Sequence, residues 1–66
     1  MTDHHHKEAA FWSESLSVWA RFVHTDLTKG DYASVLVDLN TIETNIKWLR
    51  EHAAALETEA LRNKAA

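Results

Sequence analysis

Residues 32–60, YASVLVDLNTIETNIKWLREHAAALETEA, decide the fold. Apolar or small side chains recur in this stretch at gaps that alternate between three and four residues: Tyr32, Val35, Leu39, Ile42, Ile46, Leu49, Ala53, Leu56 and Ala60. This spacing is typical of the a and d positions of a helix that packs along its length on another helix. We call this set the heptad stripe, and we expect the rest of the chain to cover it.

The chain has one natural place for a turn. It contains no proline and a single glycine, Gly30, within Thr28-Lys29-Gly30-Asp31. Gly30 suits the left-handed position after a helix, and Asp31 can then cap the start of a second helix. Thr28 is a competing cap, because Asp31 follows it three residues later, and it would move the boundary by about three residues. Either choice predicts an all-α, antiparallel two-helix hairpin.

We expect one domain after a short flexible N-terminus. The predicted boundaries are a flexible segment at 1–6 and a hairpin domain at 7–66, with a first helix at about 7–28, a turn at 28–31 and a second helix at about 31–63.

The first helix carries a wider apolar surface than one neighbour can cover. Its large apolar side chains spread over about half the circumference at 100° per residue: Phe11, Trp12, Leu16, Val18, Trp19, Phe22, Val23 and Leu27. The chain therefore needs a further neighbour, and we predict a homodimer packed as a four-helix bundle.

An antiparallel register about Gly30 predicts which residues meet. It sets Val35 near Val23, Leu39 near Trp19, Ile42 near Leu16, Ile46 near Trp12 and Leu49 near Ala9. Ala53 then reaches the histidines near the N-terminus. Because the second helix is the longer one, this register leaves Leu56, Ala60 and Leu61 without a partner in the same chain.

The turn resembles part of a known repeat. Gly30-Asp31-Tyr32, with Trp19 eleven residues before Gly30, is similar to the turn between the two helices of a tetratricopeptide repeat. The match covers about half of one repeat. Small residues of the repeat are replaced by Val23, Val35 and Ile42, and Lys47 stands at its terminal proline. We interpret the match as shared turn chemistry and assign no family.

Composition excludes several classes of protein. The chain has 66 residues, no cysteine, and seven Lys and Arg against ten Asp and Glu, for a formal net charge of −3. A small acidic chain without a basic stripe is a poor nucleic-acid binder. No apolar run approaches the length of a membrane span, and the N-terminus lacks the order of a signal peptide. We expect a cytoplasmic protein that binds neither nucleic acid nor membrane.

Histidines are the weak candidates for a metal site. His4, His5 and His6 are consecutive, and the hairpin register brings His52 to the same end of the molecule. Neutral imidazoles bind zinc, nickel and copper. Three adjacent helical positions point in three directions, however, so we predict no tight metal site and no cofactor.

Catalysis is not predicted. Ser13, Ser17, His24 and Asp26 supply the residue types of a nucleophilic site, but all lie on one helix with no pocket implied. Catalytic groups must converge in a concave site that excludes water. We therefore expect a protein that is not an enzyme.

The apolar side chains favour protein–protein interaction as the function. We expect a self-associating module that docks an unidentified protein partner, in the manner of a small phage or mobile-element inhibitor of a host protein; the alternative is a histidine-dependent metal-binding or metal-sensing bundle. Trp48 is predicted on the side of the second helix that faces away from the heptad stripe. The candidate interface residues are Phe11, Trp12, Val18, Trp19, Phe22, Val37, Trp48, Leu56 and Leu61.

Overall fold

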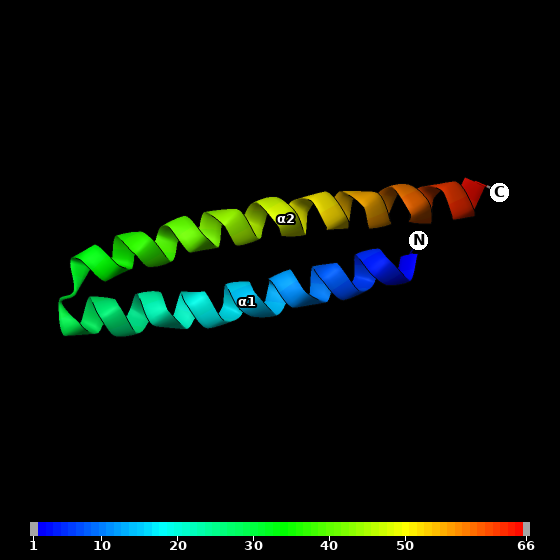
Figure 1. The fold of residues 1–66 in the computed structure, drawn as a ribbon. Coiled ribbons are helices and arrows are strands. Elements are labelled where there is room, and N and C mark those ends of the chain that lie inside the picture. The colour runs from blue at the N-terminus through cyan, green and yellow to red at the C-terminus, as the bar shows by residue number, and fades with distance from the viewer. Residues whose placement is uncertain (1, 66) are drawn as a thin grey trace.

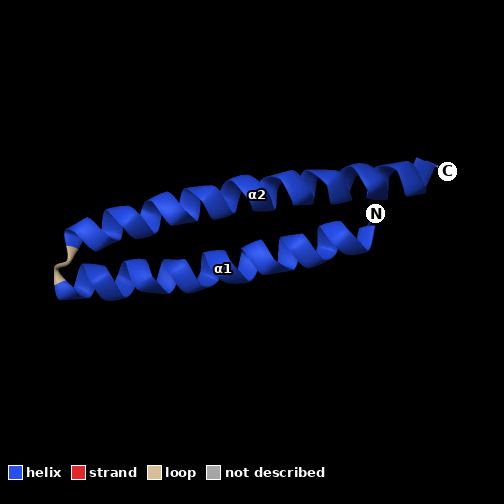
Figure 2. Ribbon diagram, viewed as in Figure 1, coloured by secondary structure: helices blue, strands red, loops and turns tan. Residues whose placement is uncertain are grey.

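Two long antiparallel helices make up the molecule. The structure, a computed structural model, describes residues 2–65 and holds α1 at Thr2–Lys29 and α2 at Tyr32–Ala65. The helices lie side by side along their length (Figure 1) and are joined only by a short turn (Figure 2). The resulting rod measures 54 × 14 × 14 Å. The predicted all-α hairpin is confirmed, and residues 2–65 contain no strand.

The turn ends α1 as the glycine predicts. Gly30 has a φ of 77°, a left-handed conformation that only glycine adopts without strain. Its N–H donates to the carbonyl of Leu27 at 3.1 Å, and the N–H of Asp31 donates to the carbonyl of Asp26 at 2.9 Å. These two bonds form a Schellman motif, which satisfies carbonyl groups at the end of the helix.

Asp31 caps the start of α2. Its carboxylate accepts the Ser34 backbone N–H at 3.2 Å and the Ser34 hydroxyl at 2.7 Å. These hydrogen bonds lower the pKa of Asp31, with the Ser34 hydroxyl as the largest cause. The competing cap at Thr28 is wrong, because the Thr28 hydroxyl donates back to the His24 carbonyl at 2.8 Å inside α1.

The helix ends differ from the predicted ones. Helix α1 begins at Thr2 rather than near Lys7, and it runs one residue past the predicted end, to Lys29. Helix α2 continues to Ala65. No proline or glycine interrupts residues 2–6, and Asp3 lies in the first turn, where a negative charge favours the helix dipole. The first helix therefore extends through most of the segment that was predicted to be flexible.

The longer α1 also changes the overhang of α2. His6 and Leu56 line the same shallow hollow, together with Ala53 and Ala60. Leu56 is half-buried, so the prediction that it lacks a partner in the chain is wrong. Leu61 remains 61% exposed, as the overhang predicts.

The face of α2 that contacts α1 is rotated from the predicted one. Val35, Ile42 and Leu49 of the heptad stripe are half-buried, but Leu39 and Ile46 are exposed. In their place the helix turns Asp38 and Asn45 inward, which are 5% and 2% exposed. At every second position of the stripe the inward residue is one position earlier, so the centre of the contact face rotates by about 50°. Polar residues of α1 meet this rotated face, as described below.

The apolar side chains between the two helices at 3–64 are at most half-buried. Among the side chains at 3–64, only Asp38 and Asn45 are buried, and no hydrophobic side chain is. The most exposed large apolar residues are Phe11, Leu27, Tyr32, Leu36, Val37 and Leu61. One helix covers only part of the circumference of another, so apolar side chains remain on the outside of the hairpin.

Candidate functional site

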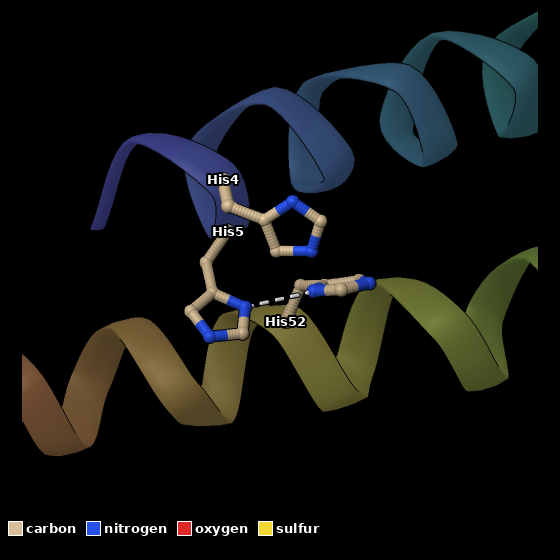
Figure 3. Close-up of side chains that lie close together, drawn as sticks. All are labelled: His4, His5 and His52. Carbon is tan, nitrogen blue, oxygen red and sulfur yellow. Dashed lines mark hydrogen bonds between the residues drawn. The ribbon is translucent and has the colours of Figure 1, made fainter. Parts of the chain in front are cut away.

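Three histidines converge at the open end of the hairpin. His4 and His5 extend from the first turns of α1 toward His52 of α2 (Figure 3). The ring centroids lie 5.4 Å apart for His4 and His5, 5.9 Å for His4 and His52, and 5.2 Å for His5 and His52. One ring nitrogen from each residue lies within 4.8 Å of the others. We call these residues the histidine cluster.

The shortest contact in the cluster joins two ring nitrogens. Nδ1 of His5 lies 3.0 Å from Nδ1 of His52. In a neutral imidazole one nitrogen carries the proton and the other accepts, so one of these two rings must donate to the other. His5 and His52 are half-buried, and His4 is exposed. The cluster is thus partly shielded by the helices and open on one side.

The cluster differs from what the sequence predicted. The predicted register brought His52 to the histidine end of the molecule, and the structure confirms this. Of the three adjacent histidines only His6 diverges, and it lines the hollow beside Leu56. His4 and His5 both reach His52, because the rotation of α2 turns His52 toward α1.

Two further polar layers lie between the helices. The Ser15 hydroxyl donates to Oδ1 of Asn45 at 3.3 Å, whereas Nδ2 of Asn45 has no hydrogen-bond partner among the described residues. Nearer the turn, Asp38 is hydrogen-bonded to Asp26 through its carboxyl group. That bond, burial and the charges of Asp26 and Asp31 raise the pKa of Asp38 to about 6, with the hydrogen bond as the largest cause. One Asp38 oxygen, Oδ2, has no hydrogen-bond partner within the part of the chain that the structure describes.

The polar layers were missed by the sequence prediction, although a signal for them was present. Asp38, Asn45 and His52 recur at seven-residue spacing. This spacing places them on one face of a helix beside the heptad stripe, where flanking positions are ordinarily polar. Because they are polar, their role at the contact between the helices was not recognised.

Tryptophans connect the helices on one side. Trp48 stacks on Trp12 with ring centroids 6.3 Å apart and an interplanar angle of 22°. The predicted position of Trp48, away from the first helix, is therefore wrong, and the same rotation of α2 accounts for it. Phe11 packs edge to face on Trp12 at 5.0 Å, and Trp19 on Phe22 at 5.2 Å.

Trp12 and Trp19 are half-buried, whereas Phe11, Phe22 and Trp48 are exposed, so these aromatic residues leave a partly exposed surface on the outside of the hairpin. We call it the aromatic face and define it as Phe11, Trp12, Val18, Trp19, Phe22 and Trp48. A shallow groove on this face is lined by Phe11, Glu14, Ser15, Val18 and Trp19. Val37, another candidate interface residue, is exposed on α2.

Comparison with known proteins adds no relative. The chain matches no family model, no curated protein and no solved structure. Neither helix, within residues 2–65, is long and apolar enough to cross a membrane.

Proposed function

We propose that the chain is a small, non-enzymatic helical interaction module that functions as a homodimer, with the aromatic faces of two hairpins packed against each other. The observation that carries this proposal is the lack of any buried hydrophobic side chain among residues 3–64. A chain of this size needs regular helix packing, a disulfide, a metal or a second subunit to offset its conformational entropy. The exposed apolar side chains are suited to packing against a second subunit.

The exposed surface area of the hairpin also supports a dimer. The hairpin exposes 5137 Å², whereas a compact monomer of its mass, 7.5 kDa, exposes about 4,200 Å². The excess is roughly 900 Å². A stable protein interface of standard size buries about 800 Å² on each partner. One interface with a second copy would therefore bring the exposed surface to the level of an ordinary folded protein.

The aromatic face has the composition of an interface. Tryptophan and other aromatic residues are enriched where interface energy is concentrated. Phe11, Val18 and Phe22 are 58%, 42% and 45% exposed, so they have apolar surface to bury. They recur at seven- and four-residue spacing along α1, which places them on one stripe of the helix. Two such stripes related by a two-fold axis would form the centre of a four-helix bundle.

The test compares two neighbouring substitutions that add the same charge. Val18→Glu places a carboxylate on the aromatic face, while Ser17→Glu places it at an exposed position near Arg21 and His24. Light scattering at tens of micromolar should give twice the 7.5 kDa chain mass for wild type and Ser17→Glu, and the chain mass for Val18→Glu. A wild-type monomer that melts cooperatively would refute the proposal.

A further inference from the structure

We propose that His4, His5 and His52 form a site, within one chain, for a divalent transition-metal cation such as Zn²⁺, which fastens the start of α1 to α2. The proposal is independent of dimerisation, because all three ligands come from a single hairpin. It rests on the convergence of residues that are 47 positions apart, His5 and His52, together with the neighbour of one of them.

The geometry is close to that of a bound ion. Zinc binds imidazole nitrogens at about 2.0–2.1 Å in a tetrahedral arrangement, which sets ligand nitrogens about 3.3 Å apart. The nitrogens of the histidine cluster already lie within 4.8 Å of one another, and one pair lies 3.0 Å apart. We expect rotations of the rings about their side-chain bonds to close the remaining difference.

The donor set determines which metals fit. Three imidazoles without a thiolate favour zinc, copper and nickel, whereas magnesium and calcium prefer oxygen ligands. Three protein ligands leave one tetrahedral position for water. His4 lies on the exposed side of the cluster, so a water molecule has access to that position.

The alternative is loose chelation by the consecutive histidines His4, His5 and His6, as in a flexible histidine tail. The two arrangements differ in which residues matter. A tail uses His6 as much as its neighbours and does not need His52. The site proposed here needs His52 and does not use His6, whose side chain lines the separate hollow beside Leu56.

The experiment is a calorimetric titration of the full-length chain with zinc, and with magnesium as a control. We expect one zinc ion per chain and no magnesium binding. Loss of a group that only supports a metal ligand already costs about 10–100-fold in affinity, so His52→Ala and His5→Ala should each weaken binding by at least about tenfold. His6→Ala should leave the affinity within about twofold of wild type, because it removes no ligand.

A thermal melt provides an independent measurement. Metal that binds only the folded state raises the melting temperature, so zinc should raise it for wild type and His6→Ala but not for His5→Ala. His5 lies near the start of α1, where a substitution disturbs the fold little. His5→Ala therefore still tests the site if His52→Ala unfolds the chain. Three results would each overturn the proposal. These are zinc binding by His52→Ala as tight as that by wild type, an equal loss of zinc affinity in His5→Ala and His6→Ala, and no zinc binding by wild type.

Discussion

Replacing Asn45 with leucine should stabilise the protein and reduce its structural specificity. Asn45 is 2% exposed, and its Nδ2 has no hydrogen-bond partner in residues 2–65. Leucine has the same number of side-chain heavy atoms and the same branching, so it removes the polar atoms with little change of shape. Asn45→Leu therefore tests whether the polar layer reduces stability.

The expected magnitude follows from three contributions. Removing an unpaired buried donor relieves about 1–3 kcal/mol. The lost hydrogen bond from Ser15, which is long at 3.3 Å, costs about 0.5–1 kcal/mol, and Ser15 can bond to water instead because it is only half-buried. Added apolar surface contributes about 1 kcal/mol in the same direction as the first term. The net gain is about 1–3 kcal/mol per chain.

Thermal unfolding followed by circular dichroism measures this gain. Each kcal/mol shifts the melting temperature of a 60–100-residue domain by about 4–8 °C. Asn40→Leu is the matched control, because Asn40 is exposed on the same helix and should show no comparable increase. A buried asparagine at a helix–helix contact fixes register and oligomeric state at a cost in stability, so Asn45→Leu should also give mixed species in size-exclusion chromatography. A lower melting temperature for Asn45→Leu would show that the amide is satisfied and refute the reasoning.

Three further predictions concern Asp38, Trp48 and the turn. The pKa of Asp38 is raised from 3.8 to about 6, so the folded state binds more protons than the unfolded state between these values. The stability that protonated Asp38 contributes is therefore present at pH 4 and is lost as the pH rises through 6. Urea melts across this range should show the free energy of unfolding of wild type decreasing. A decrease of equal size in Asp38→Asn would show that Asp38 is not its cause. Trp48→Ala removes the stacking on Trp12. Because Trp48 is 37% exposed, the loss of stability should be about 2–3 kcal/mol, less than for a fully buried tryptophan. An unchanged urea midpoint would show that the stacking contributes nothing to stability. Gly30→Ala should cost about 1–2 kcal/mol from its φ of 77° alone, since an added Cβ meets open space, and a melting temperature equal to wild type would show that the turn tolerates another conformation.

The turn and the pairing of the helices could be predicted because their causes are local. A single glycine in a chain without proline leaves one place for a reversal, and Asp31 with Ser34 supplies the cap for the next helix. Once the turn is fixed, an antiparallel register follows from the constant rise of the helix. The predicted pairing of Trp12 with Ile46 lies two residues from the observed pairing with Trp48.

The rotation of α2 could not be predicted from the same pattern. Val35, Ile42 and Leu49 face α1 whether α2 presents the predicted face or the observed one. The apolar spacing therefore does not decide between these two faces. The choice depends on whether Leu39 or Asp38 is turned inward. Asp26 of α1 lies opposite Asp38, and the periodicity of α2 contains no information about which groups of α1 lie opposite it.

The histidine cluster could be predicted only in part, because the rotation of α2 could not be predicted. Its register was predictable, since His52 was expected at the histidine end of the molecule. Its convergence was not, because it depends on the rotation of α2 and on the extension of α1 through residues 2–6. Both are properties of the pair of helices and not of either helix alone.

The short connection between the helices also makes two different dimers possible. Gly30 and Asp31 are the only residues between α1 and α2, and a chain that straightens there becomes one helix about 100 Å long, able to exchange its halves with a second copy. In the closed hairpin the two termini lie at the same end of the rod (Figure 1), so fluorophores at residues 3 and 64 would be within about 20 Å of each other. In an exchanged dimer the same two labels on one chain would be about 90 Å apart. Energy transfer within a doubly labelled chain, diluted into unlabelled protein, would therefore distinguish two assemblies that have the same mass and the same helix content.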